Sequence, residues 1–340
     1  MKLTPEIAKM ILKPICESGT PPLYGLEHFS VGFENVFETL EASYLKDIIK
    51  NNGASFKFIS AAFGNGKTHF TYQFREIAWK NNYATSYVLL SPAETQFHKL
   101  LSVFVAICQK LEKPLDESEV VEILDGKKRV QTGLMYVFKS WFQKKKAEFE
   151  KVDSSTAQEK LLEFAGTLTD FDNIYFGRAM RILFTSLLEK DLEKAEEIKV
   201  WLDGNYDNST HKKLGLKKIE DKDAFSLIKS LASLLIDQMG YSGLVIFFDE
   251  GERHALTTKN KDIQISNLRQ VIDKCGDMSL PGIMFFYTVP DENEFLQPSG
   301  HAYDAIKQRL QKHFTQETPL FPNISLDRIL SNDEQEIKHN

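Results

Sequence analysis

The chain has 340 residues, of which 42% are hydrophobic and 26% are charged, and this ordinary globular composition excludes a disordered, collagen-like or coiled-coil protein. No uninterrupted apolar run of about 18 residues is present, so the sequence predicts no membrane-spanning helix. A formal net charge of -6 excludes a protein that is basic all over, but it leaves room for a local basic face. The three cysteines, Cys16, Cys108 and Cys275, are far apart, which is typical of a reducing cytosol and disfavours a disulfide framework or a zinc site.

The N-terminal segment predicts a helical lead-in to the domain that follows. Residues 4–16 have the pattern of a short helix, with Thr4 as its cap and Pro5 in its first turn. A turn-rich linker comes next, and apolar residues at helical spacing then predict a helix over 33–51. We expect this lead-in, residues 1–52, to pack on the main domain.

Short apolar strands alternate with helices from residue 53 onward. Strands are predicted at 56–60, 85–90, 244–248, 282–290 and 323–326. Helices are predicted at 67–80, at 92–111 after a capping box at Ser91, and at 223–239, 264–275 and 302–313. This alternation predicts an α/β fold in which helices flank a parallel sheet, and it places Cys108 on a core-facing side of its helix.

Residues 113–222 interrupt the alternation. This stretch is charged, has helical periodicity and contains few strand candidates, so we expect a helical insertion between the second and third core strands. The insertion divides the predicted core into two halves, residues 53–112 and 223–330. Residues 331–340 are then expected to form a short C-terminal tail, with a helical lid largely absent.

The strongest chemical signal is the segment Gly66-Lys67-Thr68, which follows a predicted strand and opens a predicted helix. In this position backbone N–H groups and the helix dipole attract phosphate, Lys67 reaches the β- and γ-phosphates, and Thr68 offers a hydroxyl to Mg²⁺. The pattern GxxxxGK[ST] would have glycine at 61, where this chain has Ala61. We expect the loop to survive the extra methyl group, and His69 to be structural rather than catalytic. The expected nucleotide-binding residues are Ala62, Phe63, Gly64, Asn65, Gly66, Lys67, Thr68 and His69.

An acidic pair, Asp249 and Glu250, closes the apolar strand LVIFFDE. Two carboxylates at the end of a buried strand are costly unless something uses them. In phosphoryl transfer the first can hold Mg²⁺ and the second can activate the attacking water. Because the carboxyl ends of parallel strands meet at one edge of a sheet, we expect both beside Lys67. The alternative is a pair of solvated carboxylates without a role.

Further candidates are a threonine and several arginines. Thr288 ends another predicted strand at the same edge and can sense the γ-phosphate or hold the water, although an ordinary strand-end threonine is the alternative. Arg269 and Arg309, together with Arg253, are candidates for stabilising transition-state charge, supplied by a neighbouring subunit. The alternative for each is a surface ion pair.

Residues 126–146 contain seven basic residues, no acidic ones and four interleaved aromatic residues. Such a stretch can bind nucleic-acid phosphates and stack bases. The alternative is an amphipathic helix with aromatic residues in the core and solvated lysines outside. The candidate DNA contacts are Lys127, Lys128, Arg129, Lys144, Lys145 and Lys146.

Five segments occur in an order that resembles the P-loop ATP-binding proteins of bacteriophage exclusion (BREX) systems, including the shorter ATPase found beside a large helicase. They are GTPPLYGLEHFSVGFENVFETLE, AAFGNGKTHF, YVLLSPAETQFHKL, LVIFFDEGER and YDAIKQRL. The likeness covers residues 17–112 and 223–330. It implies an AAA+-like core similar to origin-recognition ATPases, with Mg²⁺ and water handled by Asp249 and Glu250. It also implies a multiprotein antiphage complex that acts on DNA.

These observations favour an AAA+-like ATPase that binds Mg-ATP, hydrolyses it slowly and assembles as a homo-oligomer with other defence proteins, such as a helicase or nuclease. A different class of function is a non-catalytic, ATP-dependent scaffold or switch that recruits such an effector, and Ala61 and the missing lid favour it. A third interpretation is a nucleic-acid-binding adaptor with a degenerate phosphate loop.

Overall fold

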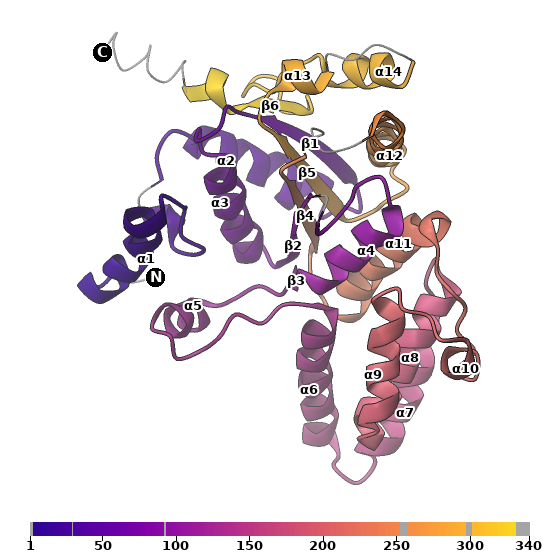
Figure 1. The fold of residues 1–340 in the computed structure, drawn as a ribbon. Coiled ribbons are helices and arrows are strands. Elements are labelled where there is room, and N and C mark those ends of the chain that lie inside the picture. Colours follow the sequence, from indigo (N-terminus) through magenta and orange to yellow (C-terminus); the bar gives the residue numbers. More distant parts are fainter. Residues whose placement is uncertain (1–2, 29, 92, 252–256, 297–300, 331–340) are drawn as a thin grey trace.

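The computed structural model describes residues 3–330 except 29, 92, 252–256 and 297–300, and at its centre is a six-stranded sheet (Figure 1). The strands lie in the order β3, β2, β4, β5, β1, β6, and every neighbouring pair is parallel except β2 with β3. The α/β fold with a mostly parallel sheet is therefore confirmed, and it is compatible with a P-loop NTPase. The strands are β1 (Ala54–Ser60), β2 (Tyr83–Leu89), β3 (Leu111–Glu112), β4 (Gly243–Asp249), β5 (Ile283–Val289) and β6 (Asn323–Ser325).

Helices cover both faces of the sheet (Figure 1). One face packs against α2 (Glu34–Leu40), the π-helical segment η2 (Glu41–Ile48) and α3 (Lys67–Lys80). The other face packs against α4 (Leu100–Gln109), α11 (Ala224–Ser233), the π-helical segment η4 (Leu234–Gln238) and α12 (Thr258–Gly276). Strands β4 and β5 are buried along their whole length, which is why their apolar runs show no alternation.

The register of the parallel strands brings distant parts of the chain to one edge of the sheet. Leu89 of β2 pairs with Asp249 of β4, and Phe248 of β4 pairs with Tyr287 of β5. Since β1 is parallel to β5 and pairs with it as far as Ser60, the loop that follows β1 starts at this same edge. The carboxyl ends of β1, β2, β4 and β5 therefore form one rim, as expected for an open parallel sheet.

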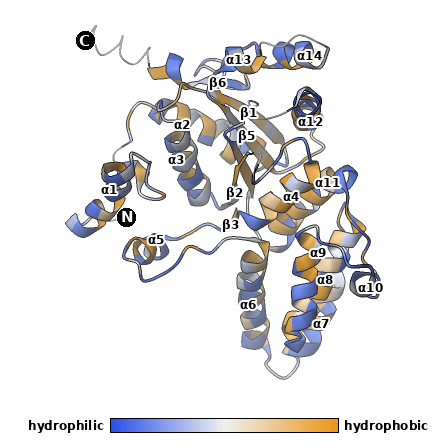
Figure 2. Ribbon diagram, in the orientation of Figure 1, coloured by the Kyte–Doolittle hydropathy of each residue, from blue (hydrophilic) through white to orange (hydrophobic). Residues whose placement is uncertain are grey.

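Residues 113–222, here called the helical subdomain, project from the sheet on the side of β3 (Figure 1). Every regular element within them is a helix: α5 (Glu117–Leu124), α6 (Leu134–Val152), α7 (Ala157–Thr167), α8 (Ile174–Glu189), α9 (Leu192–Leu202) and α10 (Asn208–His211). Hydrophobic stripes on α6 to α9 alternate with hydrophilic ones (Figure 2), and the buried apolar residues of these helices join the core beneath α4 and α11.

Most predicted helices lie close to their predicted bounds, but the helix expected from the capping box at Ser91 does not begin there. Ser91 Oγ accepts a hydrogen bond from the N–H of Glu94 at 3.0 Å, yet Thr95 forms a bridge with Leu90 and α4 starts only at Leu100. The capping contact therefore closes a turn beside the end of β2 instead of opening a helix. Pro92, predicted at the first helical position, lies outside the described residues.

Several short elements were not predicted, among them one strand and one helix. Strand β3 has two residues and α13 (Glu292–Leu296) has five, and neither is long enough to show a periodic pattern. The helix predicted over 302–313 is α14 (His301–Leu310), and the predicted edge strand is β6. Among the described residues, no helix combines the length and the apolar character that a membrane span needs.

Buried Lys57 ties the lead-in and the C-terminal segment to strand β1. Its Nζ donates to the Tyr44 hydroxyl at 2.6 Å and to the carbonyl oxygens of Pro319 and Phe321, both at 2.8 Å. Burial lowers the pKa of Lys57 to about 7. The first helix, α1 (Pro5–Ser18), begins at its predicted cap and packs against α5 of the helical subdomain.

Candidate active site

The loop between β1 and α3 turns at two glycines. Gly64 and Gly66 both have a φ of +84°, in the left-handed region that glycine adopts without strain. A side chain at Gly64 would meet no atom within 4 Å, so the backbone conformation, not crowding, favours glycine there. Gly66 directly precedes α3, whose first N–H groups have no acceptors within the helix. Such a helix start attracts an anion such as phosphate.

Ala61 stands where the phosphate-loop pattern has glycine. Its side chain is buried in the core between the sheet and α3, and its N–H donates to the Val289 carbonyl oxygen at 3.4 Å. The strand-to-helix turn therefore forms around the extra methyl group, as expected from the sequence.

Lys67 is folded back on the loop. Its Nζ donates to the carbonyl oxygens of Ala61 at 2.7 Å and Ala62 at 3.2 Å, and it lies 5.2 Å from the ring centre of Phe63. These acceptors are neutral, whereas a phosphate oxygen is charged and forms a stronger bond with an ammonium group. Lys67 can therefore exchange the carbonyl oxygens for a phosphate without leaving the loop.

Two contacts from outside the loop hold its ends. Asp327, which follows β6, accepts hydrogen bonds from the Ala62 N–H at 3.1 Å and from Asn65 Nδ2 at 2.7 Å. His69 Nε2 lies 2.5 Å from the Ser30 hydroxyl, and burial lowers the pKa of this histidine. Whether His69 also contacts the nucleotide stays a prediction, and no sequence pattern marked Asp327.

Asp249 is the centre of the polar cluster at the rim of the sheet. It is 4% exposed and interacts with hydroxyl groups from three different elements, namely Tyr87 of β2, Thr288 of β5 and Thr68 of α3. The Thr68 contact is the longest, with Oγ1 3.4 Å from Oδ2 of the carboxylate, and the N–H of Glu250 adds a fourth donor at 2.9 Å. The structure thus brings the phosphate-loop helix and the acidic strand end together, although they lie in opposite halves of the sequence.

Glu250 and Gly251 form a constrained turn directly after β4. Glu250 is exposed and has a φ of +56°, which is uncommon for a residue other than glycine. The N–H of Gly251 donates to the Thr288 carbonyl oxygen at 3.0 Å, and the Tyr287 hydroxyl donates to the Gly251 carbonyl oxygen at 3.3 Å. Backbone strain of this kind concentrates at functional sites, where the surrounding structure holds it in place.

Tyr87 is a site residue that the sequence did not reveal. Its hydroxyl donates to Asp249, and burial, followed by the nearby Asp249 charge, raises the pKa of the phenol above its ordinary value. The hydroxyl group therefore stays protonated and available as a donor. Only the register of β2 against β4 could have pointed to it, because Tyr87 lies two residues before the partner of Asp249.

The oxygen atoms at this rim fit a magnesium ion. Mg²⁺ prefers oxygen ligands, retains several waters and is usually shared between protein oxygens and substrate phosphates. Thr68 Oγ1 and the Asp249 carboxylate supply two such oxygens 3.4 Å apart at the start of α3, next to the loop that would hold the phosphates. These two residues would hold the ion, as the sequence predicts.

The predicted arginines make contacts elsewhere. Arg269 of α12 pairs with Asp273 at 3.4 Å, and Arg309 of α14 binds the same carboxylate at 2.6 Å. Arg309 also donates to the Ala305 carbonyl oxygen, so the structure brings both arginines to one acid and not to the phosphate loop. A role toward a neighbouring subunit stays a prediction, and Arg253 lies outside the described residues.

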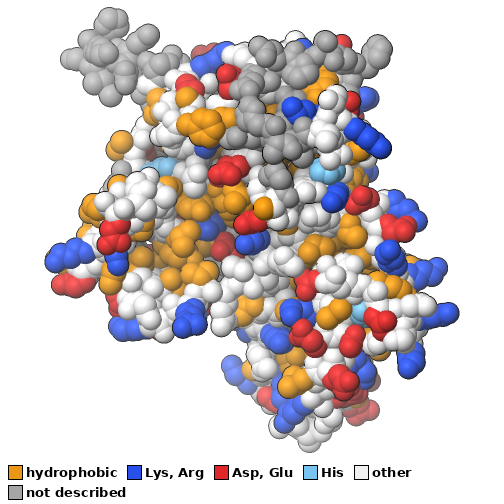
Figure 3. All heavy atoms as spheres, viewed as in Figure 1, with side chains coloured by type: hydrophobic (Ala, Val, Ile, Leu, Met, Phe, Trp, Pro, Cys, Tyr) orange, Lys and Arg blue, Asp and Glu red, His pale blue; other side chains and the backbone are white. Residues whose placement is uncertain are grey.

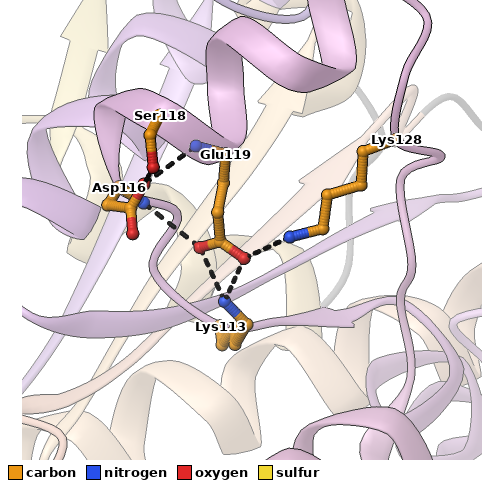
Figure 4. A network of polar contacts seen from close by, with 5 residues as sticks. All are labelled: Lys113, Asp116, Ser118, Glu119 and Lys128. Atoms are coloured by element: carbon orange, nitrogen blue, oxygen red, sulfur yellow. Dashed lines mark hydrogen bonds and ion pairs between the residues drawn. The ribbon is translucent and has the colours of Figure 1, made fainter.

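The six basic candidates for DNA contact lie at two places, in the loop before α6 and on α6 itself. Lys128 binds Glu119, which also accepts from Lys113 in a network at the start of α5 (Figure 4). On the face shown in Figure 3, basic and acidic side chains are interspersed over the helical subdomain. The pairing reduces the charge that these lysines offer to a phosphate backbone, so DNA binding stays a prediction.

The aromatic residues between these lysines belong to the core. Phe138, Trp141 and Phe142 of α6 are buried, and all three rings lie against Phe184 of α8, with centroids 5.0 to 6.5 Å apart. The amphipathic-helix alternative is therefore confirmed for these three residues. They are not available to stack on nucleic-acid bases.

Comparison with known proteins gives one family match. A family model described as "BREX system ATP-binding protein BrxC/D" matches residues 5–337, so the match includes the phosphate loop, the acidic pair and the helical subdomain. No curated protein and no solved structure matches significantly.

Proposed function

We propose, from the premise that this chain belongs to the BREX system ATP-binding protein family BrxC/D, that it binds Mg-ATP at the loop before α3 and hydrolyses it slowly. Family membership supports ATP binding within a defence system. The observation that carries the catalytic part is the contact of Thr68 with Asp249, which joins the phosphate loop to the acidic strand end.

The proposed roles follow from the chemistry of phosphoryl transfer. The N–H groups at the start of α3 bind the phosphates, and Lys67 turns from the Ala61 and Ala62 carbonyl oxygens to the β- and γ-phosphates. Thr68 and Asp249 would hold Mg²⁺, and the bound ion would supply positive charge beside the phosphates.

Glu250 is proposed as the base that activates the attacking water. Its backbone is fixed between Asp249, which accepts from its N–H, and Gly251, which is bound to β5. Thr288, next to both, is proposed to orient the water or sense the γ-phosphate, and its hydroxyl now donates to Asp249.

The nucleoside is assigned to a groove at the start of α2. This groove has a volume of about 620 Å³ and lies between the start of α2 and the segment around β6, where Asn35, Val36 and Phe314 are among its lining residues. Phe33, which precedes α2, lies against Gly66, since a side-chain carbon built on that glycine would be 3.9 Å from its ring. Because Gly32 and Glu34, the neighbours of Phe33 in the chain, line the groove, it begins close to the loop that would hold the phosphates.

We further propose that the chain has an AAA+-like core and forms a homo-oligomer. The oligomer would act on DNA together with a helicase or nuclease. The position of β5 between β1 and β4 supports such a core, because it sets Thr288 between the phosphate-loop strand and the acidic strand. Arg269 of α12 and the half-buried Arg309 of α14, which both pair with Asp273 in the single chain, are the arginines proposed to contact a second copy.

The test compares ATP binding and phosphate release in single variants. Lys67→Ala is expected to weaken ATP binding by about tenfold or more, because it removes a charge-assisted contact, whereas Lys80→Ala at the other end of α3 serves as the matched control. Glu250→Gln is expected to retain ATP binding and to lower turnover by about 10² to 10⁴, since an amide cannot accept the proton. Equal turnover in Glu250→Gln and the wild type would remove Glu250 from its role.

The same assay distinguishes the proposed ATPase from the alternative class of function. A non-catalytic scaffold or switch would bind ATP tightly and release no phosphate, even with duplex DNA and partner proteins present. Measuring the mass of the particle with and without ATP and duplex DNA would then show whether the nucleotide controls assembly.

A further inference from the structure

We infer that Tyr87 is a positioning residue that holds the Asp249 carboxylate in the orientation needed to bind Mg²⁺ beside ATP. This inference rests on the proposed function and deepens it. The supporting geometry comes from a strand that carries no recognised nucleotide-binding motif.

The register of three neighbouring strands explains why Tyr87 reaches the acid. Asp249 of β4 pairs with Leu89 of β2, so Tyr87 lies two residues earlier on the same face of the sheet. A diagonal neighbour of this kind is within reach of a long aromatic side chain. On the other side, Thr288 of β5 follows Tyr287, the partner of Phe248, and so lies beside Asp249.

The hydroxyl groups of Tyr87 and Thr288 hold the Asp249 carboxylate from β2 and β5, the two strands on either side of β4. Tyr87 donates to Oδ2, whereas Thr288 and the N–H of Glu250 donate to Oδ1. The Thr68 hydroxyl, at 3.4 Å, makes the longest of these contacts and lies on the side of the phosphate loop. A cation that binds between Thr68 and Asp249 can therefore replace this contact while the other donors keep the carboxylate in place. Such outer contacts orient metal ligands and typically change metal affinity by about 10- to 100-fold when removed.

The Tyr87 ring is itself held firmly. It meets the Tyr72 ring of α3 edge-on, with centroids 4.9 Å apart at 64°, and lies 6.3 Å from the Phe247 ring of β4. Removing only the hydroxyl oxygen leaves these ring contacts in place. Tyr87→Phe therefore removes the hydrogen bond to Asp249 while the packing between sheet and α3 is kept.

Tyr83 offers a matched control on the same strand. It is also buried, and its hydroxyl donates to the Leu45 carbonyl oxygen at 2.5 Å, at the opposite end of β2. Tyr83→Phe removes a buried tyrosine hydrogen bond without touching Asp249. A purely structural effect of losing such a bond would appear in both variants.

The experiment measures binding of a fluorescent ATP analogue at rising Mg²⁺ concentration, starting from excess chelator. Without metal, the affinity of Tyr87→Phe for the analogue is expected to lie within about twofold of the wild-type affinity. The Mg²⁺ concentration that gives half of the metal-dependent increase in analogue binding is expected to be about tenfold higher than in the wild type. Tyr83→Phe is expected to match the wild type in the metal-free affinity and in the Mg²⁺ requirement. Electron paramagnetic resonance with Mn²⁺ and ADP provides a second measurement of metal binding. Tyr87→Phe should again need about tenfold more metal for half-saturation, with the amount of bound Mn²⁺ normalised to folded protein.

The possible results separate this inference from the function on which it rests. If the wild type shows metal-dependent ATP binding but Tyr87→Phe and Tyr83→Phe have equal Mg²⁺ requirements, the positioning role is wrong and the proposed function stands. If the wild type binds no nucleotide at all, both are wrong. Weaker binding of Tyr87→Phe in chelator alone would also overturn the inference, because the residue would then act on the nucleotide and not through Asp249.

Discussion

Gly251 occupies a position at which the fold has no room for a side chain. A side-chain carbon there would lie 2.8 Å from the Thr288 carbonyl oxygen and would collide with the Tyr287 ring. Since its N–H also binds that carbonyl oxygen, Gly251 sets how closely the turn after the acidic pair approaches β5. The glycine after Glu250 therefore has a steric reason, although the sequence shows it only as part of DEGE.

Gly251→Ala is expected to displace this turn and, with it, the Glu250 side chain. Overpacking of a well-packed contact costs about 1–3 kcal/mol, so urea unfolding should show a loss of that order in the free energy of unfolding. ATP turnover should fall more than ATP binding, since the phosphate loop is not touched. Gly276→Ala, where a side chain would meet no atom within 4 Å, is the control and should be close to neutral in both measurements. An alanine at 251 that leaves turnover unchanged would contradict the argument.

At the scale of elements, the lead-in is fastened to α3 by buried charged and aromatic side chains. Arg75 of α3 donates to the Leu23 carbonyl oxygen at 2.5 Å, and its guanidinium lies 5.4 Å from the Tyr24 ring centre and 4.8 Å from that of Trp79. Glu76 accepts a hydrogen bond from the Gly25 N–H at 2.6 Å. Helix α3, which starts at the phosphate loop, therefore contacts the lead-in through its C-terminal half.

Burial raises the pKa of Glu76 to about 7, which makes the stability of this contact depend on pH. The folded state binds a proton more tightly than the unfolded state, so this contribution is fully present below pH 4.5 and is lost as the pH rises to about 7. Glu76→Gln stays neutral and can still accept from Gly25. Its stability relative to the wild type should therefore increase by something on the order of 2 kcal/mol between pH 5 and pH 8.

Urea unfolding at several pH values measures this difference. Glu38→Gln, which changes an exposed carboxyl group on α2, is the matched control. Its free energy of unfolding should depend on pH in the same way as that of the wild type. If Glu76→Gln also runs parallel to the wild type from pH 5 to pH 8, Glu76 does not titrate in this range.

At the scale of the whole molecule, the sheet and the helical subdomain share one continuous core. A single cluster of buried apolar residues extends from β4 and β5 through α4 and α11 into α6, α8 and α9. The segment that the sequence presents as basic and aromatic is thus anchored by the buried rings of α6, whereas side chains such as Lys127, Arg129 and Lys144 are exposed. The helical subdomain is expected to unfold together with the sheet, not independently of it.

Phe138→Ala tests this view of α6. The side chain is fully buried against Trp141 and Phe184, and truncation of such a ring costs about 3–5 kcal/mol. Urea unfolding should show that loss in one transition, followed both by helix content and by tryptophan fluorescence. Lys144→Ala on the exposed side of the same helix should change stability by less than about 0.5 kcal/mol. Two separate transitions, or a neutral Phe138→Ala, would contradict a shared core.

The sequence was most informative where a structure is encoded locally. The strands, the helices at 67–80 and 223–239 and the turn at Gly66 depend on short-range periodicity and on backbone preferences, and they appear close to where they were predicted. The capping box at Ser91 was misleading for the same reason. Its local hydrogen bond is present, but pairing of Thr95 with Leu90, which depends on the end of β2, prevents a helix there. The helix predicted over 264–275 begins earlier, at Thr258.

Local sequence was sufficient for the α/β class, for the family likeness and for the choice of Lys67, Thr68, Asp249 and Glu250 as site candidates, because glycine turns, buried strands and strand-end charges leave a mark on neighbouring residues. It could not name Tyr87 or Asp327 as partners of the acid and the loop. Those contacts depend on the order and register of parallel strands, which are set by the packing of helices on both faces of the sheet and leave no pattern within a single segment. Only the folded arrangement specifies which side chains surround the carboxylate that is expected to hold the metal.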